Sequence, residues 1–551
     1  MPRNRVIYNS EALFAGQKVG EKCYTEDEGV NSIKQLHRVQ NANYSFNISR
    51  TDVNQFGELA AIDRIITDTP TVALDFSYYL ANFANEEALG INVNAGVVPG
   101  TSDAADPFGD GEGLTTALKF FLDGSKDQRN YFIQTSSEGT DAANDSDDRN
   151  KSIIGIGNGF LTSYSVEASV GGLPTVSVGV EGLNMSFENG NILKNSGIGT
   201  TDYVNSWKTS TGDANGPDTN VASGRPILYD ANKNRIDFIS GITGEGAAYN
   251  GFYHATTTDV RGGTDTKARA NGRSQDWRSS GVRLPSINPV DGTKSQGVFF
   301  LPTASGHAGA DTSGILNLST LRPGDVRLYF RQVEQGAGPA LSGYSQAASE
   351  GVESFKDPDI PGVSLPTQSG YKREVADSND ADGGVQAAHI QSFNLDFGLS
   401  RTPLQRLGVK HAFSREVDFP LTVSLSVDAI LADLTTGNLA DIIDCDRSYD
   451  IAVEMCAPAD CTAGTVPHDV RGFDSRTPVA TYVLKNAKLD SESFSSSIGD
   501  NKSVTLDFTA QIGGPNQSGN GLFMKGVTPS NIGAAQFATT DTPFPTDEVL
   551  L

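Results

Sequence analysis

Two stretches of this chain decide its fold: NGFLTSYSVEASVGGLPTVSVGV at 158–180 and NAKLDSESFSSSIGDNKSVTLDF at 486–508. Aligned without gaps, they share residues at equivalent positions, namely Ser163, Ser165, Ser169, Gly171 and Val176 in the first and Ser491, Ser493, Ser497, Gly499 and Val504 in the second. In both, apolar and polar residues alternate on either side of a glycine-led turn, which is typical of a β-hairpin. The sequence therefore predicts the same hairpin twice.

A second pair of matching segments precedes these hairpins. Residues 44–48 and 395–399 alternate apolar with polar side chains, and both runs enter Ser-Arg-Thr at Arg50 and Arg401. In both, a glycine follows seven residues after the arginine, and a proline-led strand comes next. Matching segments in the same order indicate an internal repeat.

A third matching pair predicts a helix followed by a strand. The segment LTTALKFFLD from Leu114 places its apolar residues on one helical stripe, and LTTGNLADIID from Leu434 is a shorter version. A strand is expected after each helix, beginning at Tyr131 and at Tyr449.

We therefore expect a mainly β chain with two β-sandwich or barrel-like domains, each with a flanking α-helix. The first copy with an N-terminal arm takes residues 1–188, the second copy takes 389–515, and a C-terminal arm takes 516–551. Residues 189–388 are expected to form an inserted, loop-rich all-β region containing a hairpin at 227–239. Its last part, 321–334, suits either the insertion or the opening strand of the second copy.

Composition narrows the function classes. The 551 residues include 42 basic and 67 acidic ones, which gives a formal net charge of −25. Such an acidic surface repels phosphate backbones and anionic lipid, so we expect neither tight nucleic-acid binding nor membrane docking. No stretch has the apolar length of a signal peptide or a membrane span.

Each motif that could carry chemistry has a structural interpretation that we favour. The glycine-rich run at 155–159 leads into a strand rather than a helix, unlike a phosphate-binding loop. The calcium-loop spacing from Asp230 lacks the required glycine and glutamate. The acidic run at 141–148 favours a solvated loop over a cation site, and nothing places Glu86 and Glu87 in a cleft. We expect no catalytic, cofactor or metal site, and no enzyme activity.

At these repeated segments the sequence resembles the major tail-tube proteins of tailed bacteriophages. The resembling pieces are residues 43–80, 157–184, 390–408 and 490–508. The resemblance implies β-sandwich-like domains whose sheets join those of neighbouring chains into rings, which stack as a conduit for viral DNA. With two domains per chain, it implies rings of three chains with pseudo-sixfold symmetry.

The resemblance also implies a location and partners. The chain would be made in the host cytoplasm and reside in the virion, in the phage tail. It would contact itself and other phage tail proteins, and double-stranded DNA would pass through without specific binding. A capsid decoration protein and a carbohydrate-binding adhesin are the alternative functions.

Two sets of residues are candidates for function. Small polar rows would line the bore, although an outward solvent-facing position suits them equally: Ser163, Ser165, Glu167, Ser169, Ser491, Ser493, Ser495 and Ser497. The loops after the Ser-Arg-Thr sequences are expected to contact the next ring through Arg50, Gln55, Phe56, Arg401, Gln405 and Leu407.

Overall fold

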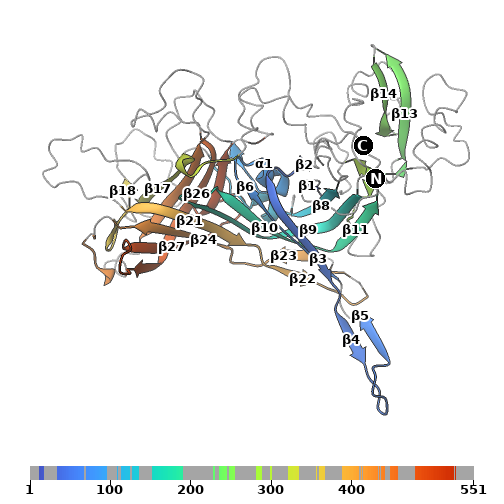
Figure 1. The fold of residues 1–551 in the computed structure, drawn as a ribbon, viewed down its shortest axis with the longest axis horizontal. Coiled ribbons are helices and arrows are strands. Elements are labelled where there is room, and N and C mark those ends of the chain that lie inside the picture. The colour runs from blue at the N-terminus through green and yellow to red at the C-terminus, as the bar shows by residue number, and fades with distance from the viewer. Residues whose placement is uncertain are drawn as a thin grey trace, which may run out of the picture.

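The chain folds mainly as antiparallel β-strands in a computed structural model (Figure 1). The structure describes residues 11–17, 34–66, 70–95, 108, 113–124, 127–135, 152–189, 228–229, 235–244, 247–254, 281–283, 285–287, 298–300, 320–333, 355–356, 359–365, 388–408, 411–412, 414–431, 434, 436–440, 447–456, 478–526 and 528.

A first series of strands pairs in the order β3-β6-β10-β9-β8-β1. Strand β2 pairs with β1, and β11 pairs with β9. The bounds are β1 Glu11–Gln17, β2 Lys34–Gln35, β3 Val39–Asn47, β6 Thr71–Tyr79, β8 Gln128–Thr135, β9 Ser152–Ser169, β10 Thr175–Gly182 and β11 Asn184–Asn189. The hairpin expected at 158–180 is confirmed as β9–β10.

A second series pairs in the order β21-β24-β27-β26-β25-β17. Strand β18 pairs with β17, and β28 pairs with β26. The bounds are β17 Val326–Val333, β18 Phe355–Lys356, β21 His389–Gly398, β24 Thr422–Ile430, β25 Ser448–Cys456, β26 Pro478–Ser495, β27 Ser503–Gln511 and β28 Gly521–Gly526. The hairpin expected at 486–508 is confirmed as β26–β27.

The long strands β9 and β26 each bend from one sheet layer to another. Their first halves pair with β8 and β11, and with β25 and β28, whereas their second halves pair with β10 and β27. At the bend lie Asn158, with φ of 53°, and Asn486, with φ of 56°. This left-handed conformation is strained for most side chains, and asparagine tolerates it because its short polar side chain bonds locally. The side-chain amide of Asn486 donates to Asn520 Oδ1 at 2.9 Å.

The two series join directly, because β9 pairs antiparallel with β21. One continuous apolar core then runs under both series, with Tyr78, Tyr164, Phe397 and Phe508 among its buried side chains. Period-2 alternation produces this core, since β24 buries Val423, Leu425 and Val427 while its intervening residues face the other way.

The described helices are short. Helix α1 (Ala84–Leu89) was not expected from the sequence, and the helix expected from Leu114 is a single turn, α2 (Lys119–Leu122). The predicted apolar stripe is nevertheless buried at Leu114, Ala117 and Phe121. Strand β7 (Asn94–Ala95), which follows α1, pairs parallel with β28 and so connects this part of the chain to the second series. Much of the second predicted helix, at 441–446, lies outside the described residues.

Two hairpins replace the loops expected after the Ser-Arg-Thr sequences. Strands β4 (Arg50–Val53) and β5 (Asp63–Ile66) pair in one, and β22 (Arg401–Leu404) and β23 (Ser414–Val417) pair in the other. Figure 1 shows the β4–β5 hairpin extending well away from the sheets, whereas the β22–β23 hairpin lies close to them.

Short strands between the series form separate small sheets. The hairpin expected at 227–239 is present as β12 (Leu228–Tyr229) with β13 (Arg235–Gly244), and β14 (Ala247–His254) extends it. Strand β15 (Gly281–Arg283) pairs with β16 (Val298–Phe300), and β19 (Asp359–Ile360) pairs with β20 (Val363–Ser364).

The structure places three strands that flank the repeated hairpins. Strand β17 pairs with β25, so residues 326–333 lie in the second series rather than with the insertion. Within the segment expected as a C-terminal arm, β28 is a buried strand. Within the expected N-terminal arm, β1 pairs with β8 along its length. The segment of β17 fits one of the two alternatives given by the sequence, whereas β1 and β28 lie outside the repeated segments and a search for repeated hairpins does not detect them.

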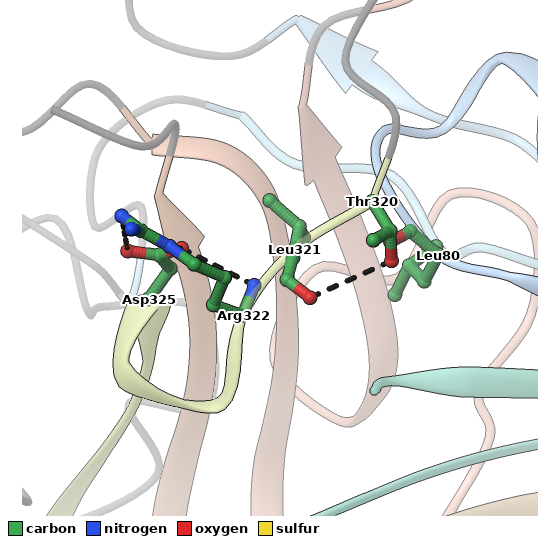
Figure 2. Close-up of polar contacts among 5 residues, drawn as sticks. All are labelled: Leu80, Thr320, Leu321, Arg322 and Asp325. Carbon is green, nitrogen blue, oxygen red and sulfur yellow. Dashed lines mark hydrogen bonds and ion pairs between the residues drawn. The ribbon is translucent and has the colours of Figure 1, made fainter. Parts of the chain in front are cut away.

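A tight turn before β17 ties the second series to the first. Thr320 Oγ1 donates to the carbonyl of Leu80, 3.3 Å away (Figure 2). Leu321 N–H donates to the same carbonyl at 3.2 Å. The turn itself, η5 (Pro323–Asp325), is closed by the Arg322 guanidinium on the Asp325 carboxylate at 2.9 Å. Because Leu80 follows β6, this contact fixes the start of β17 against the first series.

Candidate functional site: a polar sheet face with two open edges

Eight described strands form one uninterrupted sheet in the order β3-β6-β10-β9-β21-β24-β27-β26, where β26 contributes its second half. Directly opposed residues of antiparallel strands point to the same side. Across all eight strands the register brings polar residues to one side. This side, the polar face, carries Asn43, Ser45, Asp75, Ser77, Ser177, Glu181, Ser163, Ser165, Glu167, Ser169, Ser392, Asn394, Asp396, Ser424, Ser426, Asp428, Thr505, Asp507, Thr509, Ser491, Ser493 and Ser495.

The candidate bore-lining residues gather on this face. Ser163, Ser165, Glu167 and Ser169 alternate with buried residues of β9, and Ser491, Ser493 and Ser495 are exposed on β26. Ser497 instead lies in the turn after β26, where its hydroxyl donates to Asp500 at 2.9 Å. The two rows expected separately are therefore parts of a single surface.

Hydroxyl groups hold the carboxylates of the polar face in place across strands. Ser392 Oγ and Thr505 Oγ1 donate to the two oxygens of Asp428 at 2.8 and 2.6 Å. Ser426 and Ser491 do the same for Asp507 at 2.7 and 2.5 Å. Of these hydroxyl donors only Ser491 was predicted to lie on a functional surface. The aspartates were not predicted, although they also stand at alternate positions of their strands.

The charge of the polar face is mainly negative. The register places on it the carboxylates of Asp75, Glu167, Glu181, Asp396, Asp428 and Asp507, and also the basic residue Lys488, which lies opposite Thr509. A surface dominated by carboxylates and small hydroxyls offers a phosphate backbone few counterion-releasing contacts.

The eight-stranded sheet ends in two open edges. Within the described part of the chain, β3 pairs with β6 on one side only, and residues 489–495 of β26 pair with β27 on one side only. Among the described strands, the sheet therefore does not close on itself. Edge strands with unpaired backbone groups are sites of association unless they are blocked.

The two hairpins that follow β3 and β21 differ in their contacts. In the β22–β23 hairpin, the Arg401 and Arg415 guanidinium groups lie over the Phe160 ring at 5.0 and 5.6 Å, and Arg415 also pairs with Glu181. Of the predicted ring-contact residues, Arg401 is therefore engaged within the chain, whereas Gln405 and Leu407 at the tip are exposed.

The β4–β5 hairpin has an ion pair within the hairpin itself. Its Arg64 pairs with Asp52 of the same hairpin at 2.5 Å. Arg50, Gln55 and Phe56 are all exposed. The hairpin also exposes other apolar side chains, namely Val53, Leu59, Ile62, Ile65 and Ile66. Several exposed apolar residues on one projecting hairpin indicate a contact surface for another protein.

A buried carboxyl group lies behind the junction of the two series. Glu86 of α1 is fully buried, and its Oε1 accepts hydrogen bonds from Tyr78 at 2.6 Å and Tyr164 at 3.1 Å. Tyr164 also shares a 2.7 Å hydrogen bond with Tyr482 of β26. Burial raises the pKa of Glu86 to about 7, and the bonds from the tyrosine hydroxyls only partly offset this. Glu86 is thus a packing element rather than a group in a cleft.

The remaining candidate motifs give little chemistry. Gly155, Gly157 and Gly159 lie inside β9, and Gly157 packs against the backbone of Pro285 so closely that a side chain would collide with it. No group of metal-binding side chains occurs in the described ranges, and the acidic run at 141–148 and Asp230 lie outside them. None of the helices among the described residues is long and apolar enough to cross a membrane.

Comparisons with known proteins include a weak structural similarity. No family model matches the sequence, and no curated protein matches it. Among solved structures, the chain is similar to the SPP1 tail tube determined by solid-state NMR and cryo-EM, at 9% identity over 34% of this chain and 80% of that chain, with a TM-score of 0.20. Similarity at this level identifies neither a family nor a function.

Proposed function

We propose that this chain is the structural subunit of a bacteriophage tail tube, in which rings of three chains stack into a conduit for DNA. The observation that carries the proposal is the eight-stranded polar sheet with an open edge at each end. A sheet of this kind becomes edgeless when identical chains join in a ring, which removes the unpaired backbone groups.

We further propose that the two series are copies of one domain. The order of paired strands is the same in both. Shifts of register fall at matching places, between Val39 and Asn41 in β3 and between Ile390 and Ser392 in β21. The positive-φ pairs Asn158 and Asn486, Gly57 and Gly408, and Gly171 and Gly499 all occupy positions matched by the sequence repeat. Bulges and left-handed residues are local features that unrelated sheets have no reason to share.

The dimensions and charge suit a DNA conduit. Eight strands from each of three chains, at the usual spacing and tilt, would close a cylinder about 50 Å across at the backbone. In this arrangement the apolar core lies outside the sheet and the polar face lines the bore. Its carboxylates repel phosphate, so DNA slides past without being held.

The oligomeric state of the purified full-length chain tests the proposal. Negative-stain electron microscopy with mass photometry should show rings with the mass of three chains, or hollow tubes built from them. A chain that stays monomeric at every concentration and salt condition would overturn the proposal. Closed shells without a central bore would favour the capsid alternative instead.

A further inference from the structure

The junction inside the chain is a complete example of how two such domains join. Strand β21 runs antiparallel to the second half of β9, with Asn394 opposite Glu167, Asp396 opposite Ser165 and Gly398 opposite Ser163. Two backbone bonds extend the ladder, from Val170 N–H to Gln391 O and from Leu399 N–H to Thr162 O, at 2.9 and 2.8 Å.

Side chains on the core side seal this internal junction. Phe397 stacks on Tyr164 with ring centroids 5.2 Å apart and planes 18° apart. Leu395 lies opposite Val166, and both are buried. The join is therefore made by a backbone ladder, a polar side and an apolar side together.

The strands that correspond to β21 and β9 in the repeat are the two open edges. The repeat places β3 where β21 lies, because Arg50 matches Arg401. It places the second half of β26 where the second half of β9 lies, because Asn158 matches Asn486. At the internal junction, β21 of the second copy pairs with β9 of the first copy. An equivalent junction between β3 and the second half of β26 would need a second chain.

If a second chain covers the open edges, apolar side chains there should be exposed in the single chain. Phe46, which matches the buried Phe397, is 54% exposed, and Phe494, which matches the buried Val166, is 45% exposed. Strand β3 also lacks the charges and prolines that normally protect an edge strand. Glu492 Oε1 is buried without a hydrogen-bond partner among the described residues, which is consistent with an incomplete surface.

We propose that β3 of one chain pairs antiparallel with residues 491–497 of a second copy, in the register of the internal junction. This inference rests on the proposed ring and specifies its interface. Asn43 lies opposite Ser495, Ser45 opposite Ser493 and Asn47 opposite Ser491 of the second copy. On the core side, Tyr44 lies against Phe494, and Phe46 lies above Glu492. The polar face then continues across the interface without a break.

Engineered cysteines test the register. Ser45→Cys with Ser493→Cys should give covalently linked chains on a denaturing gel after mild oxidation of assembled rings, because opposed Cβ atoms lie within disulfide range. The Ser45→Cys with Ser491→Cys variant is the matched control, since it places the thiols two residues out of register. Wild-type chain and each single variant give the background from the native cysteines.

The outcomes separate this inference from the proposed function. Rings that link preferentially through the control pair, or through neither pair, would overturn the register while leaving the ring in place. Absence of rings in the wild-type chain would overturn both.

Charged substitutions at the same two positions provide a second test of the register, which does not depend on the cysteine variants. Ser45→Glu with Ser493→Glu should raise the concentration needed for half-assembly several-fold, and Ser45→Glu with Ser493→Lys should restore it. Both positions are exposed in the single chain, so monomer folding is expected to be unchanged. Equal assembly by the two variants would contradict the proposed pairing.

Discussion

At the scale of single residues, Glu86 makes the stability of this fold depend on pH. Its pKa is raised by burial to about 7, above the value of 4.5 for an exposed glutamate, so the folded state favours the protonated carboxyl. Stability from this group is fully present below about pH 4.5, falls as pH rises towards 7, and is lost above that. The loss amounts to about 3 kcal/mol by linkage.

The variant Glu86→Gln isolates this effect. Glutamine keeps a carbonyl oxygen for Tyr78 and Tyr164 but does not titrate, so the fall in thermal unfolding temperature between pH 5 and pH 8 should be smaller than in the wild type. Glu87→Gln is the matched control, because Glu87 lies next in α1 and contacts Lys34 at 3.6 Å. An unchanged pH dependence in Glu86→Gln would show that other groups cause it.

At the scale of elements, the β4–β5 hairpin is the strongest candidate for contact between rings. Replacing Phe56 and Leu59 by serine removes exposed apolar side chains, each worth about 2 kcal/mol when buried in a contact. Rings should still form, but tubes measured by electron microscopy should be much shorter. Val170→Ser, at another exposed apolar position, is the control and should leave tube length unchanged. Normal tubes from the double-serine variant would exclude this hairpin from stacking.

Elements were predictable from sequence where their signal was local. Alternation around Gly171 and Gly499 predicted both long hairpins, because the alternation of buried and exposed side chains in a strand can be recognised within a few consecutive residues. Helix α1 was missed because six residues containing a buried glutamate show no apolar stripe. The pairing of β9 with β21 was also missed. That contact joins residues more than 200 positions apart, and each strand alone has the same pattern whether it lies at an edge or in the middle of a sheet.

At the scale of the whole molecule, the two series form one sheet with one core, so a single chain already contains a third of the proposed ring. The repeated serine rows predicted this surface only in part. Its continuity depends on register across eight strands, and its charge depends on aspartates from β21, β24 and β27 that the repeat does not single out. The proposed orientation, with the polar face towards the bore, is therefore tested on assembled tubes.

Adding positive charge to the polar face tests that orientation. Tubes carrying Ser163→Arg and Ser493→Arg should retain short linear DNA duplexes, with an affinity that falls steeply with salt because each phosphate contact releases counterions. Covalently closed DNA circles cannot thread a bore, so they should not bind. Asn516→Arg with Ser518→Arg, on the exposed loop before β28, is the matched control and supplies the same charge away from the face. Equal binding of circles and linear duplexes by the polar-face variant would place this face on the outside of the tube.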